Sequence, residues 1–178
     1  RKPDSEAYQY DISKRYADGE MYAAASIKVD PTPAYKTVAG RTVYGGGGII
    51  PDVFVPVDTT RATKFFIACN KKATQMRFAS AMFDKYKSRL SEIDSDAELG
   101  IFLDRMNIPS AFRKYASSKD GIVCTQKEWE ETSEYLLPQL RALVGRYSKL
   151  GENAFYKMYL NIDPTLQKAI ESDSHIRY

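Results

Sequence analysis

Four consecutive glycines, Gly45 to Gly48, are the most distinctive chemical feature of the sequence. A phosphate-binding loop combines such glycines with a lysine and a serine or threonine that open a helix. Here Ile49, Ile50 and Pro51 follow, and this continuation favours an extended chain. A dinucleotide fingerprint would need a third glycine where Ile50 stands. The run therefore indicates backbone that needs positive φ or close approach, and we do not expect a nucleotide site.

A short acidic stretch is the next candidate for chemistry, as a calcium site. Asp94, Asp96 and Glu98 alternate as they would at the start of a calcium loop. The positions at which such a loop needs a glycine and a final acid hold Leu99 and Arg105. The acids are therefore expected to cap a helix.

The only histidine, His175, and the two cysteines, Cys69 and Cys124, give no complete catalytic set. A Ser-His-Asp triad needs a histidine held by a third group, and His175 lies near an end that we expect to fray. A histidine zinc site usually needs a second such ligand. Neither cysteine belongs to a CxxC pair, so both are expected to be free buried thiols, with one disulfide as the minority alternative. We expect no cofactor and no metal ion.

Composition places the chain among globular proteins and excludes several kinds of partner. Its 178 residues are 43% hydrophobic and include 13 tyrosines and 8 phenylalanines, which argues against disorder. The 26 basic and 23 acidic residues are interleaved, so nucleic-acid binding is not expected. No apolar run is long enough to cross a bilayer. The first residues, Arg1-Lys2-Pro3, look like the middle of a longer polypeptide.

Residues 1–60 are rich in turn-forming residues and carry only short β-type segments. Residues 35–38 and 42–44 flank a turn and predict a hairpin. Residues 53–55 predict a third strand, which Pro56 ends.

After residue 60 the apolar period becomes helical, and the sequence predicts a small helical bundle over residues 61–178. A long apolar helix face is expected to include Met76, Ala79, Phe83, Tyr86 and Leu90. The expected boundaries are a cap at Thr59 or Thr60, a capping box from Ser95, a stop at Pro109, a cap at Ser110, a capping box from Thr125, an end at Gly151 and a cap at Asp163 before Pro164. Pro138 is expected to kink or divide the helix that begins after Thr125. A further short helix is expected over Tyr8, Ile12 and Tyr16. The expected fold class is α+β and mainly α, with short strands and loops before residue 60.

The segment from Tyr35 to Val53 resembles part of the carboxyl-terminal processing (tail-specific) serine peptidases, especially forms from Bacteroidetes-like bacteria. The family pattern is GR-x-V-x-GGGGI-x-PD, and residues 54–58 also fit its continuation. Residues 154–170 resemble the helical tail of the same proteins more faintly. The residues assigned to a structural glycine-rich segment are Arg41, Gly45, Gly46, Gly47, Gly48, Pro51 and Asp52.

The resemblance implies a serine nucleophile activated by a lysine of lowered pKa, with backbone amides stabilising the oxyanion. In this family both residues precede the glycine-rich segment, so they would lie upstream of Arg1, as would a PDZ-like module. No residue of this chain is therefore assigned a catalytic role. The resemblance also implies an exported protein of the periplasm or cell envelope that acts on protein or peptide substrates.

These observations lead to one interpretation and one alternative. Residues 1–60 would be the end of the peptidase core, and residues 61–178 a C-terminal helical domain that can cover the core, shape substrate access or contact a second subunit. The chain alone would be inactive, and residues 1–60 would be irregular or paired only locally. The alternative is a non-enzymatic helical interaction module in which the glycine loop is a structural turn.

Overall fold

The computed structural model describes residues 5–27, 34–45, 51–59 and 62–173. It is 66% helical, with eight helices and one small two-stranded sheet in that part of the chain, which confirms the mainly α fold with a small β part. The chain forms two compact units, residues 1–58 and residues 59–178. That the first unit ends a peptidase core stays a prediction.

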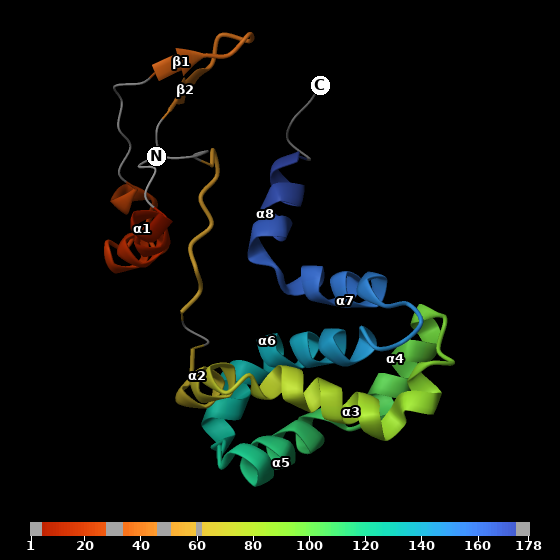
Figure 1. Cartoon of the computed structure of the whole chain (residues 1–178). Helices are drawn as coiled ribbons and strands as arrows, with labels where there is room; N and C mark the ends of the chain where they lie inside the picture. The colour runs from red at the N-terminus through yellow and green to blue at the C-terminus, as the bar shows by residue number, and fades with distance from the viewer. Residues whose placement is uncertain (1–4, 28–33, 46–50, 60–61, 174–178) are drawn as a thin grey trace. The chain divides into compact units, whose positions relative to one another are not determined.

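The first unit contains one helix and one hairpin. Helix α1 (Ser5–Ala17) confirms the predicted short helix, and a 3-10 turn, η1 (Ala24–Ser26), follows it. Strands β1 (Ala34–Lys36) and β2 (Thr42–Tyr44) pair antiparallel (Figure 1). In their register Tyr35 lies opposite Val43. The predicted hairpin is therefore confirmed.

The predicted third strand at residues 53–55 is wrong. These residues form no strand, and the Val57 amide instead donates to the carbonyl of Met21 at 2.9 Å. A β-type segment becomes a strand only beside a partner, and the described sheet contains β1 and β2 alone.

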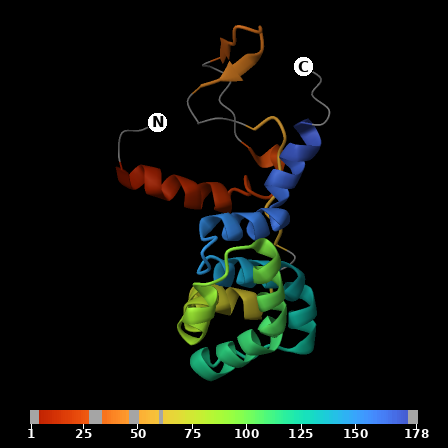
Figure 2. The same cartoon turned by 90° about the vertical axis from the view of Figure 1, so that its right-hand side faces the viewer.

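The second unit is a bundle arranged around one central helix. Helix α6 contacts α2, α3, α4, α5 and α7 (Figures 1 and 2). The elements are α2 (Lys64–Lys71), α3 (Thr74–Leu90), α4 (Asp96–Arg105), α5 (Ile108–Asp120), α6 (Gln126–Gly145), α7 (Glu152–Tyr159), the 3-10 turn η2 (Leu160–Ile162) and α8 (Pro164–Asp173).

The bundle core is built from aliphatic side chains of α6 and an aromatic cluster on α2, α3 and α5. Phe112 is fully buried, and its ring packs edge to face against those of Phe65 and Phe78, with centroids 6.2 and 5.3 Å apart. Leu136 and Leu140 of α6 are also fully buried. Such packing is the main source of stability for helices of this length, because isolated helices are marginal in water.

Several predicted helix ends are confirmed. Thr125 and Glu128 form a complete capping box at the start of α6. The Ser95 hydroxyl accepts a hydrogen bond from the Glu98 amide and caps α4, although only this half of the predicted box is seen. Asp163 caps α8, because its carboxylate accepts from the Thr165 amide at 2.8 Å.

Other predicted ends are wrong. Thr63, not Thr59 or Thr60, caps α2, and its hydroxyl also bonds to Thr132 of α6 at 2.8 Å. Pro109 does not stop a helix but lies in the first turn of α5, where its missing N–H costs nothing. Ser110 therefore lies inside α5 and is not its cap.

The predictions for Pro138, Gly151 and Met76 are corrected in the same way. Pro138 does not divide α6, because buried Leu136 and Leu140 hold the helix in the core on both sides of the proline. The helix ends at Gly145, and Gly151 precedes α7 with φ +56°. Met76 is 60% exposed, since the helices packed against α3 cover a narrower face than its apolar pattern suggested.

One carboxylate joins the starts of two helices. Glu128 accepts hydrogen bonds from the amide and hydroxyl of Thr125 at 3.1 and 2.8 Å. Its other oxygen accepts from the amide of Phe65, in the first turn of α2, at 3.2 Å. The first turn of a helix offers unpaired N–H groups and favours negative charge, so Glu128 stabilises α6 and α2 together.

The buried aromatic cluster predicts a large effect for Phe112→Ala. Loss of the ring leaves a cavity between α2, α3 and α5 and should lower the free energy of unfolding by about 3–5 kcal/mol, as measured by urea denaturation. The exposed Met76→Ala should change it by less than about 0.5 kcal/mol. Equal effects of the two substitutions would contradict the assignment of the core.

Candidate functional site

An ion pair brackets the glycine-rich segment. The Arg41 guanidinium donates to both carboxylate oxygens of Asp52 at 2.6 Å. Arg41 is placed by the hairpin turn, in which its carbonyl accepts from the Thr37 amide at 2.8 Å and Gly40 adopts φ +80°. Both charged side chains are more than half exposed, at 61% and 69%. The pair joins the end of the hairpin turn to the residue that follows Pro51.

The structure places only some of the predicted segment. Gly45 is half-buried, Pro51 is exposed, and Arg41 and Asp52 meet as described. Gly46, Gly47 and Gly48 lie outside the described residues. Among the predicted residues that the structure describes, Arg41 and Asp52 are joined, and the guanidinium occupies both oxygens of the carboxylate.

Most of the large apolar side chains that the structure describes in the first unit are exposed. Tyr35 is 63% exposed and Val38 fully exposed, and Val43, Tyr44 and Val53 are all more than a third exposed. Among residues 10–27, 34–45 and 51–58, Glu20 is the one buried side chain, and it bonds to Arg15 at 2.8 Å. A hairpin of this size cannot bury enough apolar area to be stable alone.

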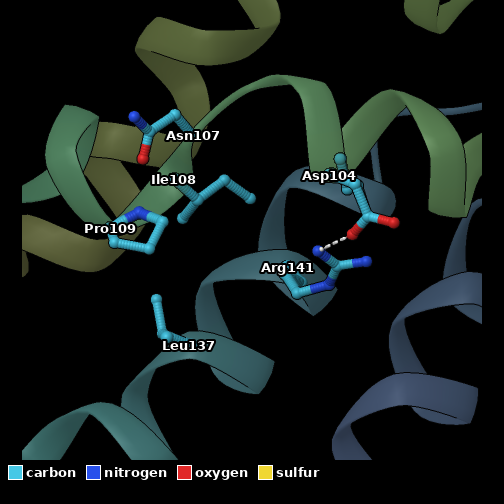
Figure 3. A pocket seen from close by; sticks show the side chains of 7 residues that line it. Asp104, Asn107, Ile108, Pro109, Leu137 and Arg141 are labelled. Carbon is cyan, nitrogen blue, oxygen red and sulfur yellow. Dashed lines mark hydrogen bonds and ion pairs between the residues drawn. The ribbon is translucent and has the colours of Figure 1, made fainter.

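The helical unit contains an open pocket of about 500 Å³ between α4, α5 and α6 (Figure 3). Its apolar wall comes from Leu103, Ile108, Pro109 and Leu137. Its polar side holds Asn107 and an ion pair between Arg141 and Asp104 at 2.7 Å (Figure 3). The sequence analysis did not find this pocket. The one residue of this pocket that a local sequence pattern could have marked is Asn107, because asparagine tolerates the left-handed conformation that it adopts between α4 and α5.

A second polar cluster centres on Asp120, at the C-terminal end of α5. Its side chain is 3% exposed and accepts hydrogen bonds from Arg77 and, at 2.6 Å, from Thr74. Lys72 donates to its backbone carbonyl at 2.8 Å. The hydrogen bonds from Arg77 and Thr74 lower the pKa of the Asp120 carboxyl below its ordinary value of 3.8. All partners come from the segment around the start of α3, so the cluster joins α3 to α5.

The cysteines are free thiols in the structure. Cys69 is fully buried in the core, and burial raises the pKa of its thiol to about 11. Cys124 is half-buried, and burial raises its pKa as well. Neither thiol has the lowered pKa of a catalytic nucleophile.

The remaining candidates from the sequence are the acids at the start of α4 and His175. Asp96 and Glu98 lie in the first turn of α4 and pair with Lys157 and Arg89, as expected of a helix cap. His175 lies outside the described residues. Within the described ranges no three His, Cys, Asp or Glu side chains gather where they could hold a metal ion. The helices of that part of the chain are also too short or too polar to cross a membrane.

No protein-family model, curated protein or solved structure matches the chain. The resemblance of residues 35–53 to carboxyl-terminal processing peptidases therefore stays a prediction.

The Asp120 cluster predicts an acid-sensitive helical unit. Because the pKa of Asp120 is lower in the folded state than in the unfolded chain, its contribution is fully present above the unfolded value and is lost as pH falls. The wild-type free energy of unfolding, measured in urea, should therefore drop between about pH 5 and pH 3.

Asp120→Asn should flatten this pH dependence, and Arg77→Ala should flatten it in part, because Thr74 still donates to the carboxylate. Each variant should therefore differ from the wild type more at pH 7 than at pH 3. If the difference in free energy of unfolding were the same at both pH values, the pKa of Asp120 would not be the cause of the wild-type pH dependence.

Proposed function

We propose that this chain is the C-terminal part of a serine endopeptidase of the serine–lysine type, which processes proteins near their C-termini. In this proposal the nucleophile and the base are encoded upstream of Arg1, and the present chain supplies no catalytic side chain. The parent protein would be exported to the periplasm or cell envelope and would act on protein or peptide substrates.

The observation that carries the proposal is the exposed apolar surface of the hairpin in the first unit. The motif that resembles the peptidases coincides with a hairpin whose apolar side chains, including Tyr35 and Val38, have no core to cover them. Strand edges and apolar faces of this kind are normally paired or covered. A larger peptidase core that receives the hairpin would supply the missing neighbours.

The Arg41–Asp52 pair then has a mechanical role. Both residues belong to the motif, and their ion pair joins the hairpin turn to the residue that follows Pro51. An exposed ion pair contributes little stability, at most about 1 kcal/mol, so its value would lie in positioning. In the parent peptidase it would place the last strand of the core and direct the chain toward the helical unit.

A non-enzymatic helical interaction module remains the second candidate, and the pocket between α4, α5 and α6 favours it. Apolar Ile108, Pro109 and Leu137 beside the Arg141–Asp104 pair offer a small amphipathic recess. The coding sequence upstream of Arg1 separates the two functions. A PDZ-like module followed by a serine and a lysine at the family spacing supports the peptidase, whereas a stop codon or an unrelated domain supports the module.

The peptidase proposal predicts that activity belongs to the longer protein alone. The full-length gene product should cleave casein, and residues 1–178 alone should not. Substituting the upstream lysine should abolish cleavage, because the serine then lacks its base. Casein cleavage by residues 1–178 would contradict the proposal, as would an inactive full-length product.

Within that protein, Arg41→Ala tests the positioning role of the pair. It should lower kcat by at least about tenfold, because a small misplacement of supporting backbone is costly to catalysis. Arg89→Ala is the matched control, since Arg89 is a similarly exposed arginine that pairs with Glu92 and Glu98 on the helical unit. Equal activity of the two variants would remove the role assigned to the Arg41–Asp52 pair.

A further inference from the structure

The two free cysteines lie on facing segments of the helical unit, and hydrogen bonds fix the register between these segments. The Glu128 carboxylate bridges the amides of Phe65 and Thr125. It therefore holds the residue before Thr125, which is Cys124, beside the first turns of α2. One helical turn after Glu128 on α6, the Thr132 hydroxyl meets the hydroxyl of Thr63, which precedes Phe65, at 2.8 Å. The two segments therefore run antiparallel.

The α2 side of this junction presents Cys69 toward the same place. Phe65 and Cys69 are four residues apart, so they lie on one face of the helix, and both are buried, at 2% and 0% exposed. Cys124 packs against the core cluster that contains Cys69. Cys124 lies in the non-helical chain just before α6, on the side toward which the antiparallel contacts of Phe65 and Thr63 direct Cys69. Besides burial, the charge of Cys124 is one of the influences that raise the pKa of the Cys69 thiol, which places the two groups near each other.

We propose that Cys69 and Cys124 are the two halves of a disulfide that forms when the chain meets a small-molecule disulfide oxidant, and that this bond fastens α2 to the start of α6. The sequence alone left this pairing as a minority alternative to two free thiols. The inference stands apart from the peptidase proposal, because it concerns the helical unit alone.

The reaction is a pair of thiol–disulfide exchanges. The partly exposed Cys124 thiolate attacks oxidised glutathione, forms a mixed disulfide and releases one glutathione thiolate. The Cys69 thiolate then attacks the Cys124 sulfur, forms the protein disulfide and releases the second glutathione thiolate. The two protons lost by the cysteines pass through solvent to the two glutathiones, which carry away both electrons.

Burial governs the rate of these steps. Since only the thiolate attacks, the raised pKa values of Cys69 and Cys124 slow both exchanges at neutral pH. We therefore expect oxidation over hours, and the completed bond to resist reduction because Cys69 is fully buried.

The test is incubation of the folded 178-residue chain with oxidised glutathione, followed by denaturing alkylation and mass spectrometry. The expected product is a monomer lighter by two hydrogen atoms, with neither cysteine alkylated and a peptide that joins Cys69 to Cys124. Its thermal midpoint should lie roughly 5–10 °C above that of the reduced chain, because the bond closes a long loop.

Two single variants serve as controls. Cys69→Ala should stop at a mixed disulfide of Cys124 with glutathione, and Cys124→Ser should leave Cys69 unreacted. Neither variant should gain thermal stability on oxidation. The inference is overturned if wild-type chain retains two alkylatable thiols, if its disulfide joins two chains, or if oxidation lowers the thermal midpoint.

Discussion

The carboxylate of Glu128 joins the starts of two helices in the helical unit and so fixes how the packed core is assembled there. It completes the capping box of α6 with Thr125 and also receives the amide of Phe65 in the first turn of α2. These hydrogen bonds lower the pKa of the Glu128 carboxyl, and the bond from the Thr125 hydroxyl has the largest effect. Because α6 contacts five other helices, the placement of its first turn sets the arrangement of the bundle. Cys124 directly precedes Thr125, whose amide and hydroxyl donate to the Glu128 carboxylate.

The two units differ in how they meet the requirements of folding. The helical unit buries a continuous apolar core from α2 to α7, and polar clusters such as that of Asp120 join its helices. The first unit has a paired hairpin and an Arg41–Asp52 ion pair, but exposed apolar side chains. Conformational entropy must be offset by buried apolar area, and the hairpin region offers little of it. This difference is the physical basis for proposing that the first unit completes a larger protein.

Local patterns in the sequence predicted much of the fold and little of the tertiary chemistry. The capping box at Thr125, the cap at Asp163 and the hairpin around Gly40 are local motifs, and the structure confirms them. The cap at Thr63 was missed because its hydroxyl is chosen by contact with Thr132, far along the chain. The strand at residues 53–55 was over-predicted because β-propensity cannot supply a partner.

The candidate sites likewise divide into those that a local sequence pattern marks and those that tertiary packing creates. Arg41 and Asp52 were singled out by a sequence pattern, and they meet in the structure. The pocket beside Leu137 and the cluster around Asp120 draw residues from separate helices, so no single stretch of sequence announces them. The burial of Cys69 was expected from the sequence. The pairing proposed for Cys69 and Cys124 depends on how α2 packs against α6, which no local pattern predicts.

Hydrogen exchange of the 178-residue chain tests the central claim most directly, namely that the helical unit is self-sufficient and the first unit is not. The account predicts strong protection of the backbone amides of α6 and rapid exchange in residues 34–45 and 51–58, including the hairpin. Strong and uniform protection of residues 34–45 and 51–58 would contradict it, because these segments would then be stable without a larger core.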